Sequence, residues 1–144
     1  MQKKFKKKLI FDAWAILAFL QKEEPAAFRI KSLLEDAQKK KHEIFISLIN
    51  LGEVYCNIGK RRSEKKAKET LEELKYLPIR VVSIDKEIVF KAATLKIYYS
   101  ISYADAFAAA LAQSLNACLI TGDPELSQLS HIIKIEKLKR TLKK

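Results

Sequence analysis

The sequence predicts an α/β fold of three layers, in which helices cover both faces of a short central parallel sheet. Short apolar runs, each about as long as one buried strand, alternate with stretches whose apolar residues recur at helical spacing. The stretch Ala104–Leu115 consists mostly of Ala, Leu and Phe, so a helix there is apolar around its whole circumference and must be buried. Strands that alternate with helices form parallel sheets with both faces covered.

The composition fits one domain with a hydrophobic core. The chain has 144 residues, of which 49% are hydrophobic, a content too high for a disordered protein. Its two cysteines, Cys56 and Cys118, lack the CxxC spacing of a zinc site and indicate no disulfide framework. We expect both to be small, buried apolar residues.

The net charge of +11 is concentrated at the two ends of the chain. Residues 1–8 carry five lysines, and residues 134–144 carry six basic residues and one acid, so each end supplies +5 and the remainder only +1. We expect a basic N-terminal extension over residues 1–8, a folded domain over 9–135 and a basic tail over 136–144. Such ends suit a polyanion such as nucleic acid, and they also aid solubility.

The apolar run Leu9–Leu20 follows several lysines, as in a signal peptide. However, Asp12 interrupts the run, and no cleavage site of small residues follows closely. The run is also too short to span a bilayer. We therefore expect a soluble, cytoplasmic protein without a membrane partner.

Five apolar runs are the expected strands, in chain order: Leu9–Phe11, Ile44–Ile46, Ile79–Ile84, Ala117–Thr121 and Ile132–Ile135. A short buried helix over Ala13–Leu20 follows the first strand, and Pro25 suits the first position of the next helix. Later helices begin after residues that can cap them: Ser47 or Asn50, Ser63, Asp85, Ser102 and Asp123. The helix after the second strand is expected to stop near Gly59, which leaves Lys60–Arg62 as a basic turn with tentative RNA contacts.

Four carboxylates stand near the carboxyl ends of these strands. Asp12 follows the first strand and Asp123 the fourth, while Glu53 lies in the helix after the second strand. Asp105 lies in the first turn of the central helix, where it also suits a capping box, and Asp123 suits a helix cap. Because ligands of parallel sheets bind at the carboxyl ends of the strands, all four can converge on one edge.

Four converging carboxylates indicate a divalent metal site. Carboxylates held close together repel each other, and a hard cation removes that repulsion. Mg²⁺ or Mn²⁺ prefers oxygen ligands and is usually held by a few carboxylates together with substrate phosphate. The chemistry expected of such a site, with one ion or two, is metal-dependent hydrolysis of phosphodiesters.

Four segments, in this order, resemble the motifs of PIN-domain ribonucleases, many of which are toxins of VapBC-type toxin–antitoxin pairs. The segments are Leu9–Asp12, Ser47–Glu53, Ser102–Ala106 and Thr121–Asp123, and the resemblance extends from about Leu9 to Ile135. It implies Mg²⁺ or Mn²⁺ at Asp12, Glu53, Asp105 and Asp123, with Thr121 beside the metal site. It also implies RNA as the substrate, a homodimer, and a small antitoxin protein as a partner.

One position departs from the family pattern. Thr or Ser commonly follows the first Asp of the family, whereas Ala13 and Trp14 follow Asp12 here, so a hydroxyl that could order water or phosphate is missing. The alternative is therefore a catalytically weak or inactive PIN-like module that binds RNA or a partner. Residual metal-dependent cleavage separates the two hypotheses.

Two other enzyme classes fit less well. A phosphatase of the haloacid dehalogenase type needs acids where Trp14 and Ser127 stand. A metal-free ribonuclease needs a general acid and base, typically His. His42 and His131 both precede expected strands, which places them at the edge opposite the acids.

Overall fold

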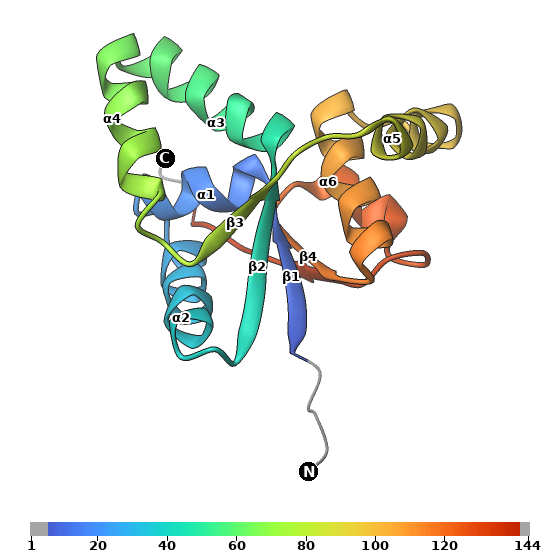
Figure 1. Cartoon of the computed structure of the whole chain (residues 1–144), viewed down its shortest axis with the longest axis horizontal. Coiled ribbons are helices and arrows are strands. Elements are labelled where there is room, and N and C mark those ends of the chain that lie inside the picture. Colours follow the sequence, from blue (N-terminus) through green and yellow to red (C-terminus); the bar gives the residue numbers. More distant parts are fainter. Residues whose placement is uncertain (1–5, 142–144) are drawn as a thin grey trace.

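Five parallel strands form the centre of the computed structural model, which describes residues 6–141 (Figure 1). In chain order they are β1 (Lys7–Phe11), β2 (His42–Ser47), β3 (Ile79–Val82), β4 (Cys118–Thr121) and β5 (Ile135–Lys137). Their order across the sheet is β3-β2-β1-β4-β5, and every neighbouring pair is parallel. The chain builds outward from β1 to β3 and then crosses to β4, so β1 and β4 flank the point where the strand order reverses.

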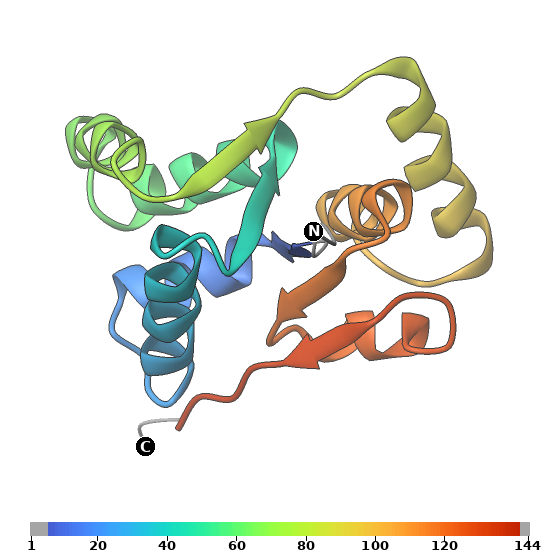
Figure 2. The same ribbon diagram turned by 60° about the horizontal axis from the view of Figure 1, so that its bottom comes forward.

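Helices cover both faces of this sheet, which confirms the expected three-layer fold (Figures 1 and 2). The helices are α1 (Ala13–Leu20), α2 (Ala26–Gln38), α3 (Leu48–Arg61), α4 (Glu64–Leu74), α5 (Lys86–Tyr98), α6 (Tyr103–Leu115) and the 3₁₀ helix η1 (Pro124–Leu129). Leu9 and Phe11 of β1 pack against the layer of α1 to α4, while Ile10 points to the layer of α5 and α6. This alternation is the two-residue period of a strand buried on both sides.

The central helix α6 is buried as its composition predicts. All residues from Asp105 to Ala112 are buried, and the small alanine side chains allow close packing. Ser102 caps its first turn, because the Ser102 hydroxyl accepts a hydrogen bond from the Asp105 amide at 3.1 Å. The cap thus fixes the turn that carries Asp105.

Each of the five strands differs from its expected bounds by at least one residue, and the differences at β5 and β3 have identifiable causes. The last strand is Ile135–Lys137 and not Ile132–Ile135, because the amides of Ile132 and Ile133 donate to the Leu129 carbonyl and close the turn after η1. β3 ends at Val82, since its only described partner, β2, ends opposite Val82 where α3 begins.

The helix α3 continues through Gly59, where it was expected to stop. The backbone of Gly59 does not have a positive φ, and the Arg62 amide still donates to the Ile58 carbonyl at 2.8 Å. Lys60 and Arg61 are therefore the last turn of a helix and not a separate loop. Pro25 is the cap residue of α2 and not its first residue as expected, so the helix begins one residue later, at Ala26.

The sheet also extends past the expected domain bounds of 9–135. β1 begins at Lys7, and β5 ends at Lys137, after which Leu138 is buried in the core. Glu136 accepts two hydrogen bonds from the Arg29 guanidinium of α2, at 2.7 and 2.8 Å. The start of the expected tail is thus part of the fold, while residues 1–5 and 142–144 lie outside the described residues.

Two smaller expectations are resolved by the structure. Cys118 is buried as expected, but the prediction for Cys56 is wrong, because its side chain is exposed on α3. Within residues 6–141, none of the helices has both the length and the apolar character needed to cross a bilayer.

Candidate metal centre

Asp12 is the most deeply buried of the four predicted carboxylates, with 1% of its surface exposed. It follows β1 directly and caps α1, because its Oδ1 accepts a hydrogen bond from the Ala15 amide at 2.9 Å. Its Oδ2 accepts a hydrogen bond from the Thr121 hydroxyl, at the end of the neighbouring strand β4. Burial raises the pKa of Asp12 to about 7, although these two hydrogen bonds act in the opposite direction.

Thr121 joins the carboxylates of β1 and β4. While its hydroxyl donates to Asp12, the same oxygen accepts a hydrogen bond from the Asp123 amide at 3.0 Å. Thr121 is itself buried, so this hydroxyl links Asp12 and Asp123 without competition from bulk water.

Asp105 enters the same edge of the sheet from the first turn of α6 and is 7% exposed. Its pKa lies well above the usual value, chiefly because it is buried and then because the Asp123 carboxylate is adjacent. The charges of Asp12 and Glu53 raise it further. These effects require the four carboxylates to share one environment.

Glu53 projects from α3 and is held by Asn50. The Asn50 side-chain amide donates to Glu53 Oε1 at 3.4 Å and to the Ala104 carbonyl of α6 at 3.0 Å. Ser47 caps α3 and donates its hydroxyl to Asn50 Oδ1, so the orientation of Asn50 is fixed from both sides. The pKa of Glu53 is raised by loss of solvent around the carboxyl and by the nearby Asp123, against the hydrogen bond from Asn50.

A fifth acid, Glu125, was missed by the sequence interpretation. One oxygen each from Asp105, Asp123 and Glu125 lies within 4.8 Å of the others, although Glu125 itself is exposed. Asp123 caps η1 by accepting a hydrogen bond from the Glu125 amide at 3.0 Å, and this tight turn brings Glu125 back toward Asp105. The sequence feature that could have indicated this residue is its position, since Glu125 is a second acid only two residues after Asp123.

The donor set fits a hard divalent cation. Every side chain in the group offers carboxylate oxygens. Burial, and then the neighbouring carboxylates, raise the pKa values of Asp12, Glu53 and Asp105, so the protein disfavours their ionised forms. A divalent cation supplies the missing positive charge and accepts this type of ligand.

The other predicted residues lie away from this group. Lys60, Arg61 and Arg62 are exposed at the far end of α3, roughly 10 Å or more from Glu53 along the helix axis. His42 begins β2 at the opposite edge and contacts the Leu33 carbonyl at 3.0 Å. His131 contacts the Tyr99 hydroxyl at 2.9 Å.

Trp14, which stands near the position of the missing hydroxyl, packs against the turn that carries Asp123. A Cβ atom added to Gly122 would lie 2.2 Å from the tip of the Trp14 ring, so only glycine permits this contact. The Arg140 guanidinium lies 5.1 Å from the centre of the same ring and pairs with Glu23 at 3.2 Å. Trp14 thereby fixes the backbone between Thr121 and Asp123.

We expect Gly122→Ala to destabilise the protein by about 1–3 kcal/mol, the usual cost of overpacking. Urea denaturation measures this cost. The double variant Gly122→Ala/Trp14→Leu should recover much of it, because the shorter side chain leaves space for the new methyl group. Strictly additive effects of the two substitutions would contradict the proposed contact.

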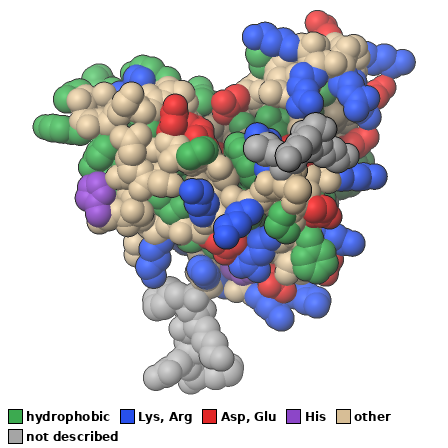
Figure 3. Space-filling view, turned by 180° about the vertical axis from the view of Figure 1, so that it is seen from behind, with side chains coloured by type: hydrophobic (Ala, Val, Ile, Leu, Met, Phe, Trp, Pro, Cys, Tyr) green, Lys and Arg blue, Asp and Glu red, His purple; other side chains and the backbone are tan. Residues whose placement is uncertain are grey.

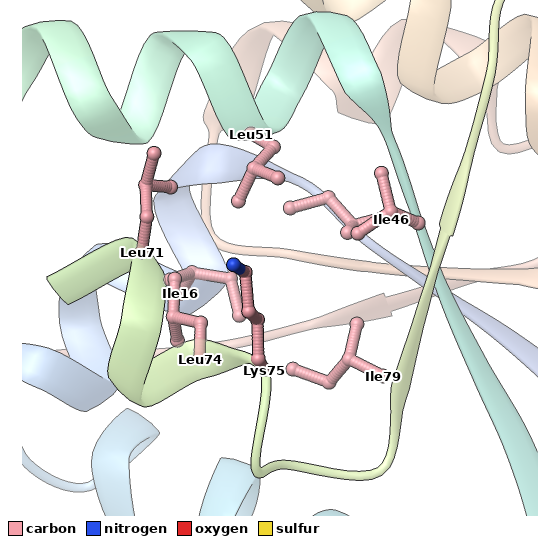
Figure 4. A pocket seen from close by; sticks show the side chains of 8 residues that line it. Ile16, Ile46, Leu51, Leu71, Leu74, Lys75 and Ile79 are labelled. Carbon is pink, nitrogen blue, oxygen red and sulfur yellow. The ribbon is translucent and has the colours of Figure 1, made fainter. Parts of the chain in front are cut away.

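An apolar pocket of about 310 Å³ lies between α3, α4 and the sheet, apart from the carboxylates (Figure 4). Its walls include Ile16, Ile46, Leu51 and Leu71, with Lys75 as its charged residue. Because it contains no carboxylate, it does not contribute ligands to the acidic group.

Comparisons with known proteins agree with this fold. The family model for the PIN domain matches residues 9–132. No curated protein matches the sequence.

Several solved structures share the fold. VapBC2 from Rickettsia felis, bound to a DNA fragment from its promoter, is 17% identical, with 92% of this chain and 99% of that chain covered and a TM-score of 0.70. VapBC-1 from nontypeable Haemophilus influenzae is 23% identical, with coverages of 90% and 97% and a TM-score of 0.66. VapC20 from Mycobacterium tuberculosis, a toxin that cleaves the Sarcin-Ricin loop, is 15% identical, with coverages of 83% and 93% and a TM-score of 0.67.

Proposed function

This chain belongs to the PIN domain family, and from that premise we propose that it is a metal-dependent endoribonuclease, the toxin of a toxin–antitoxin pair. The observation that carries this proposal is the group of carboxylates beside the point where the strand order of the sheet reverses. Two of them, Asp12 and Asp105, are buried with raised pKa values, a combination that is frequent at functional sites, and a bound cation would offset the cost of ionising them.

In this proposal Asp12, Glu53, Asp105 and Asp123 hold Mg²⁺ or Mn²⁺, and Glu125 adds a carboxylate at the exposed side. When bound, such an ion lowers the pKa of a coordinated water and offsets the negative charge of the phosphate. Thr121 holds the Asp12 carboxylate close to the backbone of Asp123 through two hydrogen bonds, and Asn50 orients Glu53. The buried carboxyls of Asp12 and Asp105 keep bulk water away from the inner side of the group.

The carboxylates also determine when RNA can approach. Without a cation, their negative charge repels the phosphates of the substrate. Productive binding of RNA at this edge therefore depends on the cation as well as on the protein.

The test is cleavage of single-stranded and structured RNA by the purified protein. We expect cleavage with Mg²⁺ or Mn²⁺ and none with EDTA. Attack by water requires no 2′-hydroxyl, so the products should carry 5′-phosphate and 3′-hydroxyl ends. Cyclic phosphate ends would exclude this mechanism, and RNA binding without any cleavage would favour the inactive PIN-like binding module instead.

We further propose that the protein acts in the cytoplasm with a small antitoxin as partner. The support is the fold shared with VapBC complexes, one of them from Salmonella typhimurium with DNA bound. A homodimer is supported by α5, which exposes Phe90, Ile97 and Tyr98 by 61%, 75% and 75%. Such apolar side chains are suited to contact with a second copy of the chain.

A further inference from the structure

Basic side chains gather at the edge of the sheet opposite the acidic group, where the strands begin. Lys6–Lys8 enter β1, Lys39–Lys41 precede β2, and Arg80 lies in the edge strand β3. Figure 3 shows Lys and Arg side chains over the lower part of the molecule, around the point where the chain enters the sheet. This edge of the sheet is thus basic, whereas the opposite edge carries the acidic group.

Part of this basic edge is a groove. It has a volume of about 390 Å³, and its charged or ionisable walls are Lys6, Lys40, His42, Glu43 and Arg80. These residues come from three separate segments: Lys6 directly before β1, Lys40 to Glu43 at the turn into β2, and Arg80 in β3. The parallel pairing of β1, β2 and β3 brings the three segments together. The groove is therefore formed by segments that the sheet brings together and not by one loop.

Two cations in the groove are available to a ligand. Within residues 6–141, neither Lys6 nor Lys40 forms an ion pair with a carboxylate. Arg80, in contrast, lies 3.9 Å from Glu43 and 5.6 Å from the centre of the Phe45 ring, so it is already held. Lys40 has a φ of 60°, a left-handed conformation that is uncommon for a residue with a side chain and that turns the backbone toward β2.

We propose that this groove binds phosphates of the RNA backbone at a distance from the acidic group. The inference rests on the proposed function, because it names a second contact for the same substrate. The strands β1 and β2 separate the two edges by roughly 16–20 Å. A trinucleotide at the acidic edge would leave the groove empty, whereas a longer RNA can reach both.

The acidic edge gives the physical reason for such a contact. It repels phosphate until a cation binds, so long-range attraction of RNA has to come from another surface. The sequence analysis left open whether the two basic ends attract nucleic acid or aid solubility. In the structure Lys7 lies in β1, and Glu136 and Leu138 belong to the fold. Deletion of residues 1–7 or 137–144 would damage the sheet or the core, so substitutions in the groove are the appropriate test.

The experiment compares the full-length protein with Lys6→Gln/Lys40→Gln. Fluorescence anisotropy in EDTA measures binding of an RNA of about 20 nucleotides over a salt series. Loss of two phosphate contacts should reduce the slope of log affinity against log salt by about 1.4. If the affinities converge near 1 M salt, this slope corresponds to about 10-fold weaker binding at 200 mM and about 60-fold at 50 mM.

The matched control is Lys31→Gln/Lys86→Gln, which removes the same charge from two exposed lysines outside the groove. We expect the control to bind the RNA like the wild type. Equal loss in the control would assign the effect to net charge and overturn the proposal. Thermal melting verifies that both variants are folded.

The outcomes also separate this proposal from the proposed function. Weaker RNA binding by the groove variant supports the groove whether or not the wild type cleaves RNA. If the wild type cleaves RNA and the groove variant binds it equally well, the groove proposal is wrong and the ribonuclease stands. Unchanged RNA binding, with weaker binding of a polyglutamate peptide, would overturn the proposal in favour of an acidic protein partner.

Discussion

Replacement of Asp105 by Asn is expected to abolish RNA cleavage and to leave the fold intact. Asp105 lies in the middle of the acidic group, next to Asp123 and Glu125, and it is buried. Asparagine keeps its shape but removes a negative charge that a cation would bind. We expect turnover to fall at least about 1,000-fold, which corresponds to about 4 kcal/mol of transition-state stabilisation.

Single-turnover cleavage with Mn²⁺ measures this loss, and circular dichroism checks the fold. The matched control is Asp85→Asn, the same chemical change at the cap of α5, where Asp85 accepts a hydrogen bond from the Ile88 amide. This control should keep both its stability and its turnover, because Asn and Asp cap a helix about equally well. A folded Asp105→Asn protein that still cleaves RNA would remove Asp105 from the site.

The sequence predicted the fold and the convergence of the four acids because both depend on local signals and simple topology. Ser47, Ser63, Asp85 and Ser102 each cap the helix that follows, as their residue types indicate. Once the strands are parallel, their carboxyl ends must share one edge, which places Asp12 beside β4.

The remaining features depend on contacts between distant residues or on exact turn geometry. Glu125 joins the acids only because Asp123 caps a 3₁₀ turn. The contact of Trp14 with Gly122 and Arg140 joins residues more than a hundred positions apart. Ile132 and Ile133 look like a strand in the sequence, since an apolar pair has the same pattern in a strand and in a buried turn.

The metal-free protein is expected to lose stability as the pH rises from about 4 to about 7. The pKa of Asp12 is about 7 in the folded protein, whereas that of an Asp exposed to water, as in the unfolded chain, is 3.8. Between these pH values the folded state therefore retains a proton that the unfolded chain releases. Stability from this proton is complete below pH 4 and is lost as the pH passes 7. The shift corresponds to about 4 kcal/mol, and the raised pKa values of Glu53 and Asp105 act in the same direction.

Urea denaturation in EDTA at pH 5 and pH 8 measures this dependence. Asp12→Asn cannot ionise at this position, so it should lose less stability than the wild type between the two pH values and be more stable than the wild type at pH 8, although Glu53 and Asp105 still titrate. Asp85→Asn should keep the pH dependence of the wild type, because Asp85 lies outside the acidic group. An unchanged pH dependence in Asp12→Asn would show that Asp12 is not the buried titrating group.

The most direct test of the central claim, that these carboxylates together bind a divalent cation, is calorimetric melting at pH 7.5 with and without Mn²⁺. Binding to the folded state alone stabilises it by about 2.7 kcal/mol when Mn²⁺ is at 100 times its dissociation constant, which is roughly 10 °C for a chain of this length. We predict this increase in the wild type and a much smaller one in Asp12→Asn and Asp105→Asn. An identical increase in the wild type and both variants would contradict the account.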